Sequence, residues 1–115
     1  MHSKDLSVLR IMQKRTASIL EYCSGYRSRE EFERNSMCVE ATVFNLMQIG
    51  ELAKASLSEQ VKESITTIPW RQIYGLRNRI VHGYEGVNMQ IVWDTVQNDL
   101  PGLKDELARV IRAAE

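Results

Sequence analysis

Apolar residues recur along this chain every three or four positions, and no stretch alternates between apolar and polar residues as a half-buried β-strand would. Such spacing places the apolar side chains on one side of an α-helix, which buries them by packing against another helix. The pattern therefore predicts an all-α fold, an up-and-down helical bundle. Because 115 residues suffice for one apolar core and not for two, we expect a single domain over residues 1–115.

The first part of the chain predicts one long and one short helix. Residues 5–22 have the amphipathic pattern, and Gly25 marks its end. Ser28 and Glu31 then have the spacing of a capping box, in which the serine side chain accepts from the third residue of the helix. A short charged helix is expected to begin here and to end near Arg34.

Residues 36–56 are apolar on nearly all sides, which predicts the buried central helix. Gly50 lies within it and would let a neighbouring helix approach closely. Gln48 and Glu51 interrupt the apolar surface. They are expected either to hydrogen-bond at a helix contact or to orient an arginine of the next helix.

Two further helices complete the bundle. Residues 69–82 are expected to be helical, with Gly75 inside the helix as a point of close packing. Asn88 is a suitable N-cap for the last long helix. Pro101 either kinks that helix or restarts it, because proline has no backbone N–H to donate.

Residues 77–84 read Arg-Asn-Arg-Ile-Val-His-Gly-Tyr and combine permanent cations with an imidazole that titrates near neutrality. On an ideal helix Asn78 and His82 share a side that faces away from the apolar stripe. Arg77 lies about 140° around the helix from His82. The two side chains therefore meet only through the length of the arginine, an irregular last turn or a second subunit.

The protonation of His82 is subject to opposing influences. Gly83 is suited to end the helix, so that His82 would lie in its last turn, where the helix dipole raises the pKa of an imidazole. Arg77 and Arg79 would lower that pKa. In either case the group titrates near cellular pH, as a general acid or base must.

The formal charge of the chain is zero, which argues against a general nucleic-acid coat protein. No acidic residue, however, lies between Glu63 and Glu85, where three arginines and three aromatic residues occur, Tyr84 among them. Guanidinium groups beside aromatic rings are suited to hold phosphates and unstacked bases. The residues expected to contact RNA outside the catalytic set are Trp70, Arg71, Tyr74 and Arg79.

RNA carries its own nucleophile, since removal of the 2′-OH proton lets that oxygen attack the adjacent phosphorus. In this reading His82 is the base or the acid, Arg77 stabilises the charge on the phosphate oxygens, and Asn78 orients His82 or donates to the phosphate. Neither a metal ion nor a cofactor is required. One histidine cannot serve as both base and acid in one step, so a symmetric homodimer with two copies of His82 is expected.

The run from Arg77 to Tyr84, together with the sequence on both sides of it, resembles the HepT-like branch of the HEPN superfamily. The resemblance implies a dimeric, metal-independent endoribonuclease toxin of a type VII-like toxin–antitoxin system. It also implies a partner, an MntA-like nucleotidyltransferase antitoxin, that attaches AMP to the tyrosine of the motif, here Tyr84. An attached nucleotide beside Arg77 and His82 would compete for the phosphate site.

Two other functions are compatible with these residues. One is a non-catalytic HEPN dimer that acts as a docking or helper subunit for a nucleotidyltransferase, and the other is a plain helical interaction module. The phosphate ligand also stays open between Arg77, to which the family pattern points, and Arg79, which is closer to His82 in helical register.

Other classes of site and location are disfavoured by the sequence. It contains no paired-cysteine, H-E-x-x-H or phosphate-loop motif, so no metal site is expected. Cys23 and Cys38 are interpreted as reduced thiols of a cytoplasmic protein. Neither a signal-peptide pattern nor an apolar run of membrane-spanning length occurs, so no membrane association is expected.

Overall fold

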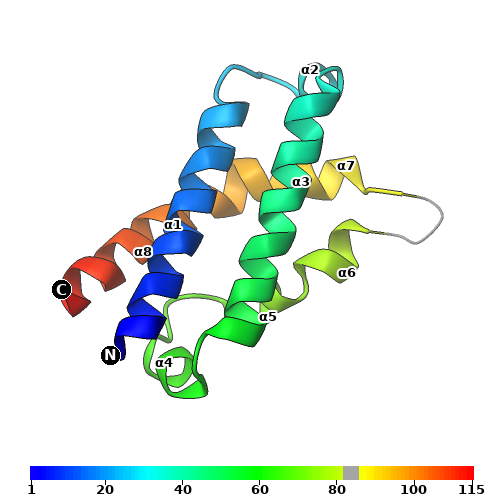
Figure 1. Ribbon diagram of the computed structural model, residues 1–115. Helices are drawn as coiled ribbons and strands as arrows, with labels where there is room; N and C mark the ends of the chain where they lie inside the picture. The colour runs from blue at the N-terminus through cyan, green and yellow to red at the C-terminus, as the bar shows by residue number, and fades with distance from the viewer. Residues whose placement is uncertain (82–85) are drawn as a thin grey trace.

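The computed structural model describes residues 1–81 and 86–115, and within these ranges every regular element is a helix. Helix α1 (Ser3–Cys23) and helix α3 (Ser36–Glu51) run antiparallel side by side (Figure 1). Short helix α2 (Arg29–Glu33) connects them. The expected all-α fold is confirmed.

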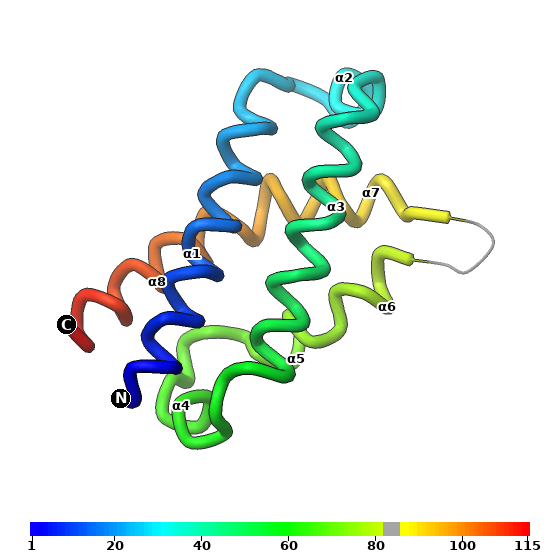
Figure 2. Tube along the Cα trace, viewed as in Figure 1, coloured from blue at the N-terminus to red at the C-terminus, as the bar shows by residue number. Residues whose placement is uncertain are grey.

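The remaining helices pack against this pair. Helices α5 (Trp70–Tyr74) and α6 (Leu76–Ile80) follow one another along α3, and helix α7 (Met89–Asp94) returns the chain toward helix α8 (Leu100–Ala114), which packs along α1. Successive long segments thus reverse direction. Figure 2 shows that the two ends of the chain lie near each other, on the side of the molecule away from α6.

Two wider, π-helical turns continue α-helices. The turn η1 (Leu52–Ser56) extends α3 toward helix α4 (Glu59–Ser64), and the turn η3 (Thr95–Asp99) lies between α7 and α8. Pro101 occupies the first turn of α8, where a missing N–H leaves no hydrogen bond unmade. Pro101 was expected either to kink the last helix or to restart it, and its place in the first turn of α8 corresponds to a restart.

Side chains cap the helices where the sequence indicated. Ser28 Oγ accepts from the backbone N–H of Glu31 at 3.2 Å, and the Glu31 carboxylate accepts from the backbone N–H of Arg27 at 3.1 Å. Asn88 Oδ1 accepts from the N–H of Ile91 at 3.1 Å at the start of α7. Because these bonds satisfy N–H groups that no helical carbonyl can reach, both helix starts are fixed by local sequence.

The core is formed by apolar side chains from every long helix. Phe32 of the short helix α2 is fully buried as well, and its ring lies 5.6 Å from that of Trp93 on α7, centroid to centroid. The largest fully buried side chains are Leu9, Met12, Ile19, Phe32, Leu46, Ile49, Ile80, Val92, Val96, Leu100 and Leu107.

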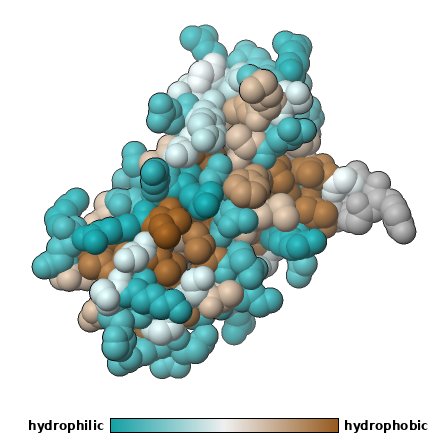
Figure 3. All heavy atoms as spheres, viewed as in Figure 1, coloured by the Kyte–Doolittle hydropathy of each residue, from teal (hydrophilic) through white to brown (hydrophobic). Residues whose placement is uncertain are grey.

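The expectation that residues 36–56 are buried on nearly all sides is wrong for the outer side of α3. Met37 is 80% exposed and Phe44 is 56% exposed. Ile11 and Tyr22 of α1 are exposed as well, and Figure 3 shows the resulting brown and tan surface over α1 and α3 between hydrophilic side chains. The bundle buries only one side of the α1–α3 pair, so the apolar residues on the other side of these helices stay exposed.

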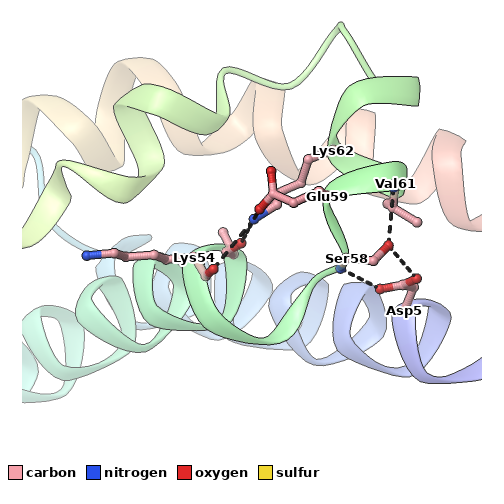
Figure 4. A network of polar contacts seen from close by, with 7 residues as sticks. Asp5, Lys54, Ser58, Glu59, Val61 and Lys62 are labelled. Carbon is pink, nitrogen blue, oxygen red and sulfur yellow. Dashed lines mark hydrogen bonds and ion pairs between the residues drawn. The ribbon is translucent and has the colours of Figure 1, made fainter.

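Lys62 of α4 is buried, with 7% exposure, and its ammonium group holds the end of α3. Lys62 Nζ donates to the carbonyl oxygens of Ala53 at 3.1 Å and Lys54 at 3.5 Å, and it pairs with Glu59 at 2.9 Å (Figure 4). It also lies 4.9 Å from the centroid of the Tyr74 ring. Burial lowers the pKa of Lys62, but the hydrogen bonds with Tyr74 and Glu59 outweigh that effect and raise it, so the group is charged.

Asp5 connects the start of α1 to the same region. Its carboxylate, 3% exposed, accepts from the backbone N–H and the hydroxyl of Ser58, both at 2.9 Å (Figure 4). Ser58 Oγ in turn accepts from the N–H of Val61 and caps α4. The hydrogen bond from the Ser58 N–H outweighs burial and holds the pKa of Asp5 below its ordinary value. We call Asp5, Ser58, Glu59 and Lys62 the α4 junction.

Candidate functional site

Two consecutive short helices, α5 and α6, lead into the motif, which begins at Arg77 of α6. Gly75 lies between the two helices. Gly75 has a ψ of −2°, and a Cβ added there would meet only ordinary contacts. The expectation of close packing at Gly75 is therefore wrong. Gly75 instead marks the boundary between the two helices, and Ile73 and Leu76 on either side of it are buried.

Close packing does occur at Gly50 of α3, as expected. A Cβ added to Gly50 would lie 3.0 Å from the backbone oxygen of Ile73 and 3.9 Å from the Cβ of Leu76. Any side chain larger than hydrogen would have to displace backbone there. Gly50 therefore sets how near α5 and α6 lie to α3, and with that the position of the motif.

The helix ends earlier than the sequence indicated. Helix α6 stops at Ile80, and Val81 is extended, with φ −101° and ψ 122°. Val81 forms an antiparallel β-bridge with Val87, and the N–H of Asn88 donates to the oxygen of Ile80 at 2.7 Å. The expected helix over residues 69–82 is thus wrong at Val81, whose extended backbone pairs with Val87, and residue 82 lies outside the described residues.

His82 and Tyr84, the expected acid–base group and modification site, lie outside the described residues. The Val81–Val87 bridge nevertheless fixes where the chain leaves α6 and where it returns toward α7. Gly86, with a φ of 83°, takes the left-handed conformation just before Val87. We call Val81, Gly86 and Val87 the neck.

Three polar side chains of the motif project from α6. Arg77, Asn78 and Arg79 are exposed, whereas Leu76 and Ile80 of the same helix are buried. The expected separation of an apolar side from a polar side is therefore present as far as Ile80. Within residues 1–81 and 86–115, the guanidinium group of Arg77 forms no ion pair or hydrogen bond.

Arg77 and Arg79 point in different directions, since two residues correspond to about 200° around a helix. Arg79 lines a cavity of about 350 Å³ between α5–α6 and η3–α8, together with Asp99 and Glu106. Of these two carboxylates, Glu106 is already engaged by Arg109 and by the Thr67 hydroxyl. Arg79 thus shares its surroundings with acidic groups, whereas Arg77 lies outside that cavity.

The aromatic residues near the arginines differ in their availability. Trp70 is buried, with 9% exposure, and its Nε1–H donates to the oxygen of Ile65 at 2.9 Å. This corrects the expectation that Trp70 contacts RNA, because its ring is part of the core. Tyr74 is half-buried and has Lys62 over its ring, so at most one side of it is open to a base. Arg71 is exposed.

Gln48 and Glu51 were expected either to bond at a helix contact or to orient the arginine. Gln48 is half-buried and Glu51 is exposed. Neither forms a hydrogen bond or an ion pair with Arg77 among the residues that the structure describes. The structure thus gives no support for an orienting role.

Sequence reasoning missed both the α4 junction and the cavity beside Arg79. Lys62 lies in the polar run Glu-Gln-Val-Lys-Glu-Ser, where nothing distinguishes a buried lysine from its exposed neighbours. Across the described part of the chain, no three His, Cys, Asp or Glu side chains gather closely enough to hold a metal ion. No helix in that part is long and apolar enough to cross a membrane.

Comparison with known proteins identifies the family. The family model described as ribonuclease HepT-like matches residues 12–110. A protein of Caldanaerobacter subterraneus subsp. tengcongensis named "Putative RNase" is 32% identical over 85 residues, covering 74% of this chain and 75% of that protein. The "Probable ribonuclease HepT" of Thermococcus cleftensis is 31% identical over 90 residues, covering 70% of this chain and 81% of its own.

A "Putative RNase" of Methanocaldococcus jannaschii is 34% identical over 77 residues, covering 67% of this chain and 70% of that protein. No solved structure matches the chain significantly. The family model covers the helical bundle from α1 to α8, including the motif on α6. The chain therefore belongs to the ribonuclease HepT-like family of the HEPN superfamily.

Proposed function

We propose that this protein is a metal-independent endoribonuclease that cuts single-stranded or looped RNA. The observation that carries the proposal is the exposed guanidinium group of Arg77, which has no ion pair or hydrogen bond among residues 1–81 and 86–115 and lies on α6 just before the neck that leads to His82. A cation without a protein partner is available to a phosphate. Membership of a family of ribonucleases supplies the class of substrate.

The reaction needs a proton to be removed and another to be delivered. A base takes the proton of the 2′-OH, and the 2′ oxygen attacks the adjacent phosphorus. The bond from phosphorus to the 5′ oxygen then breaks, and an acid protonates that oxygen, which leaves a cyclic phosphate and a free 5′-OH. His82 supplies the base or the acid, Asn78 orients it or donates to the phosphate, and Arg77 binds the non-bridging oxygens.

Arg77 is a better candidate than Arg79 for the phosphate ligand. The cavity beside Arg79 contains the carboxylates of Asp99 and Glu106, which would repel a phosphate. We assign a different role, binding of the nucleotides that flank the cleaved bond, to Arg71, Arg79 and the open side of Tyr74. Such contacts contribute affinity and leave the chemistry unchanged.

We propose a symmetric homodimer, because two copies of His82 allow one to act as base and the other as acid. The exposed apolar side chains of α1 and α3 provide surface that a partner could bury (Figure 3). Light scattering would give the mass of the assembly, and a monomer that cleaves RNA at full rate would contradict the dimer.

Regulation is proposed from family membership and Tyr84. An MntA-like nucleotidyltransferase antitoxin would transfer AMP to Tyr84, in a type VII-like toxin–antitoxin system acting in the cytoplasm. The phosphodiester would compete with RNA for Arg77. Incubation with a cognate nucleotidyltransferase and ATP should add the mass of AMP to the wild type and leave Tyr84→Phe unchanged.

The central test is cleavage of a labelled RNA with and without EDTA, using wild type, His82→Ala and Arg77→Ala. We expect cleavage that survives EDTA, yields a cyclic phosphate, and disappears in both variants. Equal background cleavage by all three proteins would favour the non-catalytic HEPN dimer that assists a nucleotidyltransferase. Binding of the nucleotidyltransferase by all three would then support that function.

A further inference from the structure

The two cysteines of this chain lie opposite each other where α1 meets α3. Cys23, the last residue of α1, is 3% exposed, and its Sγ lies 3.6 Å from Thr42 Oγ1 on α3. Cys38 is one helical turn before Thr42, on the same side of α3. Its thiol donates to the backbone oxygen of Tyr22, the residue preceding Cys23, at 3.6 Å. Each sulfur thus reaches the helix of the other, next to the other cysteine.

Cys38 also influences the protonation of Cys23. Burial raises the pKa of Cys23 to about 11, and both the charge of Cys38 and a hydrogen bond with its thiol act in the same direction, while a hydrogen bond with Thr42 opposes them. Cys23 is therefore a protonated, shielded thiol. Cys38 is partly exposed and is the sulfur that a dissolved oxidant reaches first.

We propose that Cys23 and Cys38 form a reversible disulfide when the protein meets a peroxide. The Cys38 sulfur attacks one peroxide oxygen, the O–O bond breaks, and Cys38 becomes a sulfenic acid while one water leaves. The Cys23 sulfur then attacks Cys38, the S–O bond breaks, and the second water leaves as the S–S bond forms. Two thiols lose two electrons and two protons to one peroxide, which is reduced to two waters. A dithiol reductant reverses the change.

The disulfide would close a ring around helix α2, which supports α7. Phe32 of α2 contacts Tyr26 and Trp93, with ring centroids 6.1 Å and 5.6 Å apart, and Arg29 donates to Gln90 of α7 at 3.1 Å. Helix α7 begins immediately after the neck. Oxidation at residues 23 and 38 is therefore expected to restrict opening of α2 and of the start of α7.

The test is a peptide map after peroxide treatment of the folded wild type, Cys23→Ser and Cys38→Ser. Each protein is treated with hydrogen peroxide, denatured in iodoacetamide and digested with trypsin. In the wild type we expect peptides 16–27 and 35–54 to be linked to each other, and to separate after dithiothreitol. In Cys23→Ser we expect a sulfenic acid at Cys38 that dimedone traps, whereas in Cys38→Ser the buried Cys23 should be alkylated in full.

The comparison uses a peroxide concentration that oxidises Cys38 in Cys23→Ser. If both cysteines of the wild type were alkylated after the same treatment, the proposal would be overturned. Links only between separate molecules would overturn it too. A second measurement uses the wild type alone and so does not depend on folding of the variants. Oxidation should raise the unfolding temperature and slow hydrogen exchange in residues 29–33 and 89–94, and dithiothreitol should reverse both. Unchanged exchange in a protein shown to be linked would contradict the role of α2.

Discussion

The α4 junction and helix α6 both carry charged residues, but they use them in opposite ways. At the junction, Lys62 and Asp5 are buried, and each makes two or more polar contacts within the chain, those of Asp5 both with Ser58. On α6, Arg77, Asn78 and Arg79 are exposed, and Arg77 has no partner in residues 1–81 or 86–115. Burial of a charge is tolerated only when partners replace water, so the junction charges serve the fold. The guanidinium groups of α6 have no such partners among residues 1–81 and 86–115, as the proposed binding of RNA requires.

This difference separates the expected effects of mutation. Changes at the junction should lower the free energy of unfolding and leave the rate of RNA cleavage intact. Changes on α6 should slow RNA cleavage and leave the free energy of unfolding nearly unchanged. Each of the following expectations tests that separation.

The largest effect is expected for Arg77→Gln, with Arg79→Gln on the same helix as the matched control. Loss of the cation that we propose to bind the phosphate should slow RNA cleavage about 10²- to 10³-fold. The free energy of unfolding should change by no more than about 0.5 kcal/mol, because the side chain is exposed and has no partner among the residues that the structure describes. Cleavage rates and urea denaturation measure the two quantities. Equal losses of activity in both variants would mean that the arginines act together and that the difference in their surroundings is irrelevant.

Next, Lys62→Met should destabilise the protein by about 3 kcal/mol, because the Ala53 and Lys54 carbonyl oxygens lose a charged donor. Lys54→Met is the control, since Lys54 is exposed and its side chain points away from the junction in Figure 4. Urea denaturation at pH 7 gives both values. If the two variants were equally stable, Lys62 would not hold the end of α3.

Gly50→Ala links the two regions, because Gly50 sets the distance from α3 to α5 and α6. The added methyl group would lie 3.0 Å from the Ile73 oxygen, so we expect a loss of about 1–2 kcal/mol together with slower cleavage. Gly102→Ala is the control: its Cβ meets open space within α8, and alanine there should stabilise by about 0.5–1 kcal/mol. Cleavage assayed well below the unfolding temperature distinguishes a displaced motif from an unfolded protein.

The smallest effect is expected for Asp5→Asn, about 1.5 kcal/mol at pH 7, from the weaker hydrogen bonds to Ser58. The pKa of Asp5 is lowered in the folded state, so its contribution to stability is present above the unfolded pKa and is lost as the pH falls through the folded one. The difference between wild type and variant should therefore shrink as the pH falls below about 4. A difference that is the same at pH 7 and at pH 3 would show that the carboxylate charge is not involved.

Most of the fold could be predicted because it follows from local rules. Helical spacing of apolar residues predicted α1, and capping side chains predicted the starts of α2 and α7, since each depends on residues three or four positions apart. The end of α6 depends instead on a pairing between Val81 and Val87. Val81 lengthened the apparent helix pattern, although two β-branched residues in a row, Ile80 and Val81, also favour an extended chain.

The candidate site was predicted in part. The exposure of Arg77, Asn78 and Arg79 follows from their places between Leu76 and Ile80. Trp70 was misread because it neighbours Arg71, yet it lies three residues before Ile73 and so on the same apolar side. The burial of Lys62 has no local signal, because it is decided by contacts with residues eight and nine positions earlier in the chain.

The adjacency of the two chain ends has a practical consequence for engineering. Arg10 pairs with Glu115 at 3.6 Å, and both termini lie on the side away from α6 (Figure 1). A short peptide could join them, and new ends could be opened in the exposed turn at Gly25 between α1 and α2. Affinity tags or fluorescent reporters attached to residue 1 or residue 115 would likewise project away from α6.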